Sequence, residues 1–316
     1  MKSIKILVLV ILSAAVIAGC SKATYKKTTG GMPYQLYKGK DTKKITVGNF
    51  IKVNLIQKIK DSVYFTTYDK LPIYIPVSAT PNMYDISELW TSLSPGDSFV
   101  ATQMMDTFIK RMPDNIPKEF KKGDKIMTYV KILDVFPNDS LRMLDEEKLK
   151  KVYLENEVSF LEKYLKEKNI TVQKTPSGAY VQIISPGSDM KVGLGKYITV
   201  NYTGTAFFSL KKFDSNTDTS FHHTDPLGFT VGTTGPGSMI KGLDEAVQLL
   251  NKGSVAKIYI PSMLGYGPSP DPRTGIKPFE HLIFDITVLD IKDKEPIRAE
   301  MKPIAPQKVD ATQPKK

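Results

Sequence analysis

The sequence predicts an α+β protein in which a helical segment joins two β-rich domains. Short apolar runs of strand-like composition, separated by turn residues, fill residues 33–137. Residues 141–168 are rich in Glu, Lys and Leu and contain no Gly or Pro, which is typical of a helix. Short motifs recur between the two halves at a nearly constant offset, and the length of 316 residues is enough for two domains.

The chain starts with a segment that has the composition of a secretory signal. Two lysines precede an apolar run over residues 6–18, which is shorter than the roughly 20 apolar residues of a transmembrane helix. The run ends at Ile17-Ala-Gly-Cys20, which resembles the bacterial lipobox, and Cys20 is the only cysteine, so no intramolecular disulfide can form. We expect a lipoprotein signal peptide over residues 1–19 and lipidation of Cys20. A signal anchor that stays attached is the alternative.

The charge of the chain is moderately basic. The formal net charge is +11, and loss of the two lysines in residues 1–19 leaves +9. Basic and acidic residues are interspersed, which favours a solvated surface over a patch for anionic lipid headgroups or acidic partners. No motif that combines aromatic and basic residues is present, so we expect no nucleic-acid partner.

The segments after Cys20 follow in a clear order. Residues 20–32 are polar and predict a flexible tether. Residues 33–137 form the first domain. Its strand-like runs are Phe50–Leu55, Ser62–Phe65, Ile73–Ile75, Ile126–Val130 and Ile132–Phe136.

The second half starts with a helical linker over residues 138–173. Leucine and valine at 154, 158, 161 and 165 recur on one helical face, which predicts packing on a neighbouring domain rather than a coiled-coil dimer. The second domain spans residues 174–293. The tail, residues 294–316, contains four prolines and too little apolar surface to bury, so we expect it to be disordered.

A weak internal repeat links the two domains. Leu93-Ser-Pro-Gly96 corresponds to Leu250-Asn-Lys-Gly253, Ile132-Leu-Asp-Val135 to Val288-Leu-Asp-Ile291, and residues 47–53 loosely to residues 194–200. The first two correspondences have offsets of 157 and 156 residues. The repeat predicts two domains of one fold, with chance similarity between two β-rich domains as the alternative.

The second domain contains six motifs whose order and spacing resemble the FKBP-type peptidyl-prolyl cis-trans isomerases. They are Ile198-Thr-Val-Asn-Tyr-Thr-Gly204, Lys212-Phe-Asp-Ser215, Met239-Ile-Lys-Gly-Leu-Asp-Glu-Ala-Val247, Ile258-Tyr-Ile-Pro261, Leu264-Gly-Tyr-Gly267 and His281-Leu-Ile-Phe-Asp-Ile286. The resemblance covers roughly a third of the chain. It implies that each domain is an antiparallel sheet wrapped around a short helix, and that the second domain is an isomerase with an apolar, aromatic-lined pocket.

The resemblance also implies the site residues. The catalytic positions are matched by Tyr202, Phe213, Asp214, Ile240, Tyr266 and Phe284, and the substrate-binding positions by Leu227, Met239, Leu243 and Ile276. The backbone N–H of Ile240 and the hydroxyl of Tyr266 are implied to bond substrate carbonyls, with Asp214 near the twisting amide. Leu227 replaces an aromatic residue and Leu243 a common tryptophan, so we expect a dry pocket that is wider or shallower.

Such a pocket suits rotation about an X–Pro bond. The barrier is roughly 18–20 kcal/mol, because rotation breaks amide resonance. The twisted amide has a less polar carbonyl, so a dry pocket penalises the planar form more than the twisted one. This differential binding requires no nucleophile, metal or cofactor. His222 and His223 are adjacent in sequence, so their side chains diverge on a strand and do not predict a metal site.

The same positions are mostly not kept in the first domain. The Tyr202 position falls near Leu55 and the Phe284 position near Thr128, and Tyr68-Asp69 is the nearest substitute for the Phe-Asp pair. Trp90, the only tryptophan, is expected to be a floor or core residue. We therefore expect a degenerate domain that keeps the fold without the activity and serves as a spacer, a substrate-gripping module or a dimerisation surface.

Three functions stay open. The first is isomerisation of X–Pro bonds in exported polypeptides, whose folding waits on this slow step. The second is a chaperone-like module that binds extended, Pro-containing segments, and the third is a structural lipoprotein. The matched site residues favour the first function. Ser21 follows the cysteine where an inner-membrane retention signal has Asp, so we expect anchoring in the outer membrane facing the periplasm.

Overall fold

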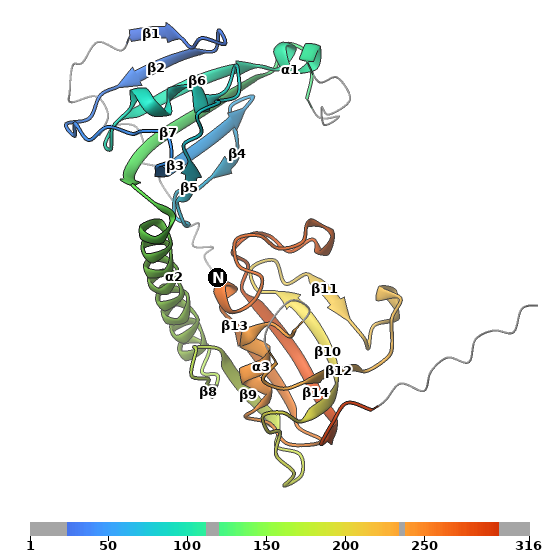
Figure 1. Cartoon of the computed structure of the whole chain (residues 1–316). Helices are drawn as coiled ribbons and strands as arrows, with labels where there is room; N and C mark the ends of the chain where they lie inside the picture. The colour runs from blue at the N-terminus through green and yellow to red at the C-terminus, as the bar shows by residue number, and fades with distance from the viewer. Residues whose placement is uncertain (1–23, 112–119, 234–237, 297–316) are drawn as a thin grey trace, which may run out of the picture. The chain divides into compact units, whose positions relative to one another are not determined.

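The computed structural model describes residues 24–111, 120–233 and 238–296 (Figure 1). The expected signal peptide over residues 1–19, Cys20 and the tail from residue 297 onward lie outside the described residues. The chain divides into two compact units that meet in sequence between Tyr153 and Leu154. In the described ranges, no helix is both long enough and apolar enough to cross a bilayer.

The first unit contains a seven-stranded antiparallel sheet. Its strands are β1 (Thr24–Lys27), β2 (Pro33–Tyr37), β3 (Phe50–Ile59), β4 (Ser62–Thr66), β5 (Ile73–Pro76), β6 (Ser98–Met104) and β7 (Lys125–Phe136). They lie in the order β1-β2-β6-β7-β3-β4, and β5 also pairs with β3. Buried residues alternate along β3 and β6, as expected for strands with one face on a core. The 3₁₀-helix η1 (Ile86–Ser92) adds Leu89 and Trp90 to this core, and the short helix α1 (Met105–Arg111) follows β6.

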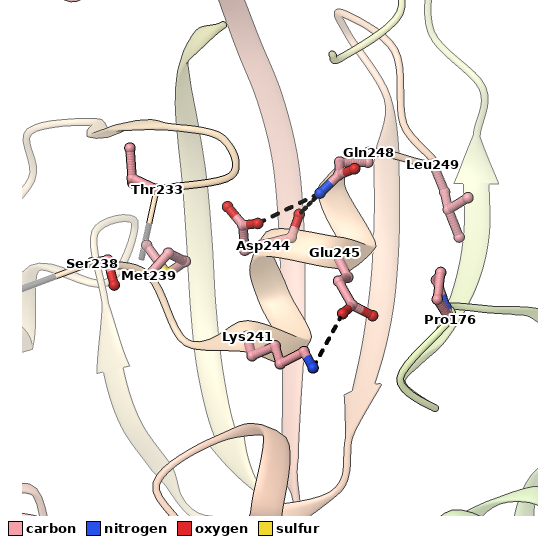
Figure 2. A pocket seen from close by; sticks show the side chains of 9 residues that line it. All are labelled: Pro176, Thr233, Ser238, Met239, Lys241, Asp244, Glu245, Gln248 and Leu249. Atoms are coloured by element: carbon pink, nitrogen blue, oxygen red, sulfur yellow. Dashed lines mark hydrogen bonds and ion pairs between the residues drawn. The ribbon is translucent and has the colours of Figure 1, made fainter. Parts of the chain in front are cut away.

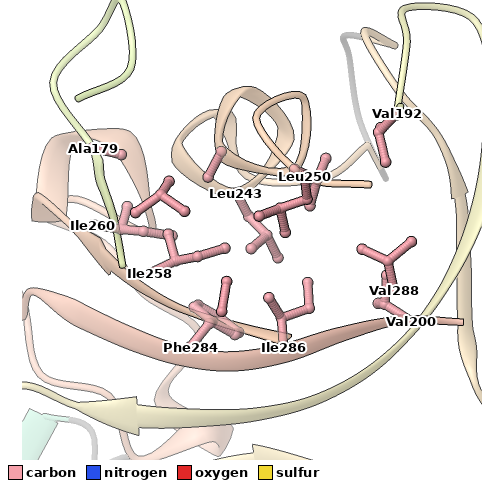
Figure 3. Close-up of a cluster of buried hydrophobic side chains, with 14 of the residues drawn as sticks. Ala179, Val192, Val200, Leu243, Leu250, Ile258, Ile260, Phe284, Ile286 and Val288 are labelled. Atoms are coloured by element: carbon pink, nitrogen blue, oxygen red, sulfur yellow. The ribbon is translucent and has the colours of Figure 1, made fainter. Parts of the chain in front are cut away.

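The second unit contains another seven-stranded antiparallel sheet. Its strands are β8 (Gln173–Lys174), β9 (Tyr180–Ser185), β10 (Tyr197–Ala206), β11 (Lys212–Ser215), β12 (Leu227–Thr230), β13 (Val255–Ile260) and β14 (Leu282–Lys292). Helix α3 is Lys241–Val247, and the 3₁₀-helices are η3 (Thr219–Phe221), η4 (Ser262–Leu264) and η5 (Pro272–Thr274). The order is β11-β10-β14-β13-β9-β8, with β12 paired to β10. Leu243 of α3 and Leu250 face Phe284 and Ile286 of β14 across the core (Figure 3).

The two sheets have the same topology, which confirms the predicted α+β fold and the internal repeat. When β1–β7 are matched with β8–β14 in order, every pairing of one sheet recurs in the other. The irregularity in β3 between Lys52 and Val53 recurs in β10 between Thr199 and Val200. The repeat is therefore structural and not a chance similarity.

Residues 24–32 differ from the expected flexible tether. β1 pairs with β2, and Met32 is fully buried. The carboxylate of Glu88 accepts hydrogen bonds from the Thr28 hydroxyl at 2.8 Å and from the Gly30 backbone N–H at 2.6 Å. These contacts order the segment, so the folded part of the first domain starts by Thr24.

The linker contains one long helix, α2 (Asp139–Glu167), which crosses the boundary between the two units. Its first turns contact the first unit: Asp145 accepts hydrogen bonds from Lys52 Nζ at 2.8 Å and from the Tyr74 hydroxyl at 2.5 Å. From Leu154 onward it belongs to the second unit, where Leu161 and Leu165 are buried. The predicted apolar face of the helix therefore packs on a domain.

Candidate active site

The ten predicted site residues lie around one apolar cluster of the second unit. Leu243, Ile276 and Phe284 are buried within it, and Tyr202, Phe213, Leu227, Met239 and Ile240 pack against it. Tyr266 is connected to this cluster by its ring contact with Phe213, and Asp214 by its hydrogen bond from the Tyr202 hydroxyl. β10, β11, β12, β14, α3 and three loop segments supply these residues, so the fold brings all ten to one place.

Phe213 is at the centre of an aromatic wall. Its ring centroid lies 5.7 Å from that of Phe284 at an interplanar angle of 81°, and 6.4 Å from that of Tyr266 at 88°. Tyr202 completes the wall, 6.2 Å from Phe284. Edge-to-face packing of this kind suits the quadrupoles of the rings and fixes their orientation.

Gly204 makes room for this wall, although it was not among the predicted site residues. It lies on β10, opposite Phe284 of β14 and Asp214 of β11. A Cβ atom at this position would be 2.6 Å from Phe213 Cε2 and 3.1 Å from Phe284 Cε1. Only glycine lets the Phe213 ring lie across the strand at this distance. Its place at the end of the Tyr-Thr-Gly motif was the available signal.

Asp214 is held by three donors or potential donors. The Tyr202 hydroxyl donates to its Oδ2 at 2.6 Å, and the Ser215 backbone N–H donates to its Oδ1 at 2.9 Å. His223 Nε2 lies 2.7 Å from the same Oδ1. Burial, followed by the hydrogen bond to Asp214, raises the pKa of Tyr202. Burial, followed by the charge of Asp214, also raises the pKa of Tyr266, so both phenols stay protonated and can donate at neutral pH.

No sequence pattern indicates that His223 belongs to this site. The 3₁₀-helix η3 ends at Phe221, and its C-cap residue His222 has a φ of 59°, in the left-handed region. This turn brings the next residue back toward Asp214, 9 positions earlier in the chain. Asn216 was missed as well: its side chain accepts from the Tyr202 N–H at 2.7 Å and donates to the carbonyls of Val200 and Asp225.

Two hollows adjoin this domain. One, of about 320 Å³, is lined by Tyr202, His223 and Leu227 among others, so it lies beside the aromatic wall where leucine replaces the usual aromatic. The other, of about 710 Å³, is lined by Pro176, by residues of α3 and by the segments on either side of this helix, which supply Thr233, Ser238, Met239, Gln248 and Leu249 (Figure 2). Met239 is its only predicted site residue. In the part of the chain that the structure describes, no three His, Cys, Asp or Glu residues are grouped to hold a metal ion.

Comparison with known proteins supplies the family. The family model for FKBP-type peptidyl-prolyl cis-trans isomerases matches residues 188–289. A peptidyl-prolyl cis-trans isomerase of Schizosaccharomyces pombe is 38% identical over 119 residues, which are 37% of this chain and 98% of that protein. The chain belongs to the FKBP-type peptidyl-prolyl cis-trans isomerase family. The matched region lies in the second unit, whose sheet is called the isomerase domain from here on.

Two bacterial relatives match the chain over about half of their own length. The FKBP-type isomerase FkpA of Escherichia coli K12 is 31% identical over 164 residues, which are 51% of this chain and 55% of that protein. The outer membrane protein MIP of Legionella longbeachae is 34% identical over 37% of this chain and 46% of its own length. This chain thus spans about half the length of these two relatives. A crystal structure of Escherichia coli FkpA matches with 30% identity and a TM-score of 0.36 over 46% of this chain and 62% of that chain.

The matched sheets allow the first domain to be compared with the isomerase domain position by position. Leu55 takes the place of Tyr202 and the buried Thr128 that of Phe284, because their strand partners correspond. The Thr67 N–H bonds the Leu55 carbonyl as the Asn216 N–H bonds the Tyr202 carbonyl.

This register matches the Phe213-Asp214 pair with Tyr64-Phe65 and not with Tyr68-Asp69, so the expected substitute was wrong. Tyr68-Asp69 lies in a turn beyond β4, where Asp69 has a φ of 62°. Trp90 is a buried core residue that matches Val247, and Ile86 takes the floor position of Leu243.

Proposed function

We propose that the isomerase domain accelerates cis-trans isomerisation of X–Pro bonds in exported polypeptides. The six catalytic residues are Tyr202, Phe213, Asp214, Ile240, Tyr266 and Phe284. The observation that carries this assignment is the Asp214 carboxylate, which accepts a hydrogen bond from a neutral tyrosine at the edge of a wall of perpendicular aromatic rings. The same cluster supplies a charged group, hydroxyl donors and an apolar surface within one small region.

In this mechanism the prolyl ring lies against Phe213 and Phe284. The Tyr266 hydroxyl and the Ile240 N–H hold the carbonyl oxygens on the two sides of the proline. Ile240 is well placed for this role, because its own carbonyl accepts from the N–H groups of Leu243 and Asp244 at 3.0 Å each, which fixes its peptide units at the start of α3. These groups stabilise the twisted amide more than the planar one, which lowers the rotation barrier.

The four substrate-binding residues extend the apolar surface. Leu243 and Ile276 are buried and form the floor, whereas Leu227 and Met239 are half-buried at the rim. Leu227 also lines the hollow of about 320 Å³ beside Tyr202.

A lipid anchor at Cys20 would place the domain at the cell envelope, in the outer membrane facing the periplasm. The lipobox-like Ile17-Ala-Gly-Cys20 supports this location, as does one relative that is named an outer membrane protein. Mass spectrometry of the N-terminal peptide should show a diacylglyceryl cysteine that is lost in Cys20→Ala. An unmodified Cys20 in membrane fractions would contradict the anchor.

The first domain supports a second function, the binding of extended segments. Its strand β4 ends the sheet, and Val63, Tyr64 and Phe65 on it are 55%, 65% and 44% exposed. An exposed, apolar edge strand can pair with an extended chain. Suppression of aggregation of an unfolded protein should weaken in Tyr64→Ser, with isomerase activity unchanged.

The experiment that tests the main proposal is isomerisation of a short X–Pro peptide by the chain from Ser21 onward. Phe284→Ala should lose most of the activity, because it removes the ring that both Tyr202 and Phe213 contact. Leu289→Ala is a matched control, because Leu289 lies on the same strand and is 36% exposed. No activity above the uncatalysed rate in the parent chain would reject the proposal.

A further inference from the structure

Helix α2 places a buried carboxylate beside the loop that carries Tyr266. Glu157 is 6% exposed, although it lies on a helix that precedes the isomerase sheet. Its Oε1 accepts a short hydrogen bond from the Ser262 hydroxyl, and its Oε2 accepts from the Met263 N–H at 3.0 Å. The 3₁₀-helix η4 follows Pro261, which gives it no side-chain cap. Glu157 therefore satisfies N–H and O–H groups at the start of η4 that no local residue caps.

Ser262 connects this contact to Tyr266. Ser262 is fully buried, and its carbonyl accepts hydrogen bonds from the N–H groups of both Gly265 and Gly267 at 2.9 Å each. These two glycines flank Tyr266 in the chain. The backbone on both sides of Tyr266 is therefore held by the carbonyl of Ser262. The hydroxyl of Ser262 is in turn held by Glu157.

His281 is a second side chain that holds Ser262, through its backbone N–H. The Ser262 N–H donates to His281 Nδ1 at 3.2 Å, which requires that this nitrogen carries no proton. His281 Nδ1 lies 3.7 Å from Glu157 Oε1, and since the imidazole is neutral this contact is not an ion pair. Burial lowers the pKa of His281 to about 4, in agreement with a neutral ring. Phe160 of α2 packs on the imidazole at 5.4 Å between centroids.

We propose that Glu157 is a positioning residue of the isomerase, which fixes the Tyr266 loop through Ser262 and so makes the linker helix part of the catalytic machinery. This inference rests on the proposed role of Tyr266. It predicts that a residue 105 positions before Ser262, outside the matched family region, controls the rate of isomerisation.

Two variants of Glu157 and one control test this inference in the chain from Ser21 onward. Glu157→Ala removes both acceptors, and we expect kcat/KM to fall about tenfold, close to the fall in Tyr266→Phe. Glu157→Gln can accept from Met263 and donate to Ser262, so it should recover most of the activity. Glu155→Gln changes an exposed carboxylate on the same helix and should have no effect.

A double-mutant cycle separates positioning from general support of the fold. If Glu157 acts through Tyr266, Glu157→Ala should cost less than about twofold in the Tyr266→Phe background. Equal costs in both backgrounds would overturn the inference, because Glu157 would then act independently of the Tyr266 hydroxyl.

Hydrogen exchange supplies a readout that does not need activity. The amides of Gly265 and Gly267 should exchange at least tenfold faster in Glu157→Ala, whereas amides of β13 should keep their protection. Unchanged exchange at these glycines would overturn the inference even if activity fell. Faster exchange together with an unaffected Tyr266→Phe variant would instead overturn the proposed role of Tyr266 and, with it, the catalytic part of the inference.

Discussion

Gly204→Ala tests the geometry of the aromatic wall with the smallest possible change. The added methyl would start 2.6 Å from Phe213 Cε2 and 3.1 Å from Phe284 Cε1. Optimal carbon–carbon separations are about 3.5–4.0 Å, so the Phe213 ring must move by roughly 1 Å. Both rings belong to the proposed catalytic set, and the variant should therefore lower activity without adding or removing a polar group.

The size of the effect follows from the overpacking. Inserting a methyl into a well-packed site costs about 1–3 kcal/mol. If the displaced Phe213 and Phe284 rings stabilise the twisted amide less well by this amount, kcat/KM falls by about 5- to 150-fold. Phe213 is only half-buried and lies at the margin of the core cluster, so we expect only a small loss in Tm.

The assay compares Gly204→Ala with Gly193→Ala by X–Pro peptide isomerisation and thermal unfolding. A Cβ at Gly193 would meet only Lys196 Cγ at 3.7 Å, an ordinary contact with a flexible side chain. Gly193→Ala should therefore match the parent in both measurements. A folded Gly204→Ala variant with full kcat/KM would refute the assignment of the Phe213–Phe284 wall as the catalytic surface.

Three further predictions concern ionisable groups. Asp214→Asn should lower kcat/KM by about tenfold or more while peptide binding persists, because a hydrogen bond to a charged acceptor is worth about 1.5–3 kcal/mol. An equal loss of kcat/KM and of peptide affinity would argue for a binding role alone. Glu88→Ala should destabilise the first domain by about 1–3 kcal/mol, as seen in the fluorescence of the buried Trp90, and an unshifted transition would contradict the role of this carboxylate. The folded-state pKa of His281 is about 4, against an ordinary value of 6.5, so the unfolded chain binds more protons between these values. The free energy of unfolding should therefore fall by up to about 3 kcal/mol as pH falls through this window. His281→Gln should remove this contribution to the pH dependence. The raised pKa of Glu157 contributes a pH dependence of opposite sign.

Eight of the ten residues predicted for the second-domain site, all but Leu227 and Ile276, lie in short contiguous motifs, which made their places in the fold predictable from the sequence. Tyr202, Asp214 and Phe284 are fixed by their places on paired strands, and strand pairing follows from the order of the motifs. The internal repeat could be seen in the sequence because its matching segments are short and contiguous, and they form turns and strands that both sheets contain. Gly96 and Gly253, one of these matches, have φ values of 84° and 80°.

The missed features depend on geometry that short motifs do not contain. His223 reaches Asp214 only because His222 adopts a left-handed conformation, and no pattern requires that. The Tyr68-Asp69 assignment failed because the hairpin between β3 and β4 turns at Lys60 and Asp61, which both have positive φ. This hairpin is tighter than its counterpart between β10 and β11, so the offset between matching residues is 147 before it (Ile56 and Thr203) and 149 after it (Thr66 and Ser215).

The two repeats separate what the fold requires from what the chemistry requires. Glu88 and Glu245 are matched, and each carboxylate accepts hydrogen bonds from the turn before the corresponding strand, from Thr28 and Gly30 in one domain and from Ser177 in the other. This contact survives in both domains because it orders the chain. The groups around the substrate do not survive: a phenylalanine stands at the Asp214 position and a leucine at the Tyr202 position. Thr128 at the Phe284 position removes an aromatic ring as well, so the changes fall on the residues proposed to face the substrate while the supporting contact is kept, which is the pattern expected of a domain that keeps the fold without the activity.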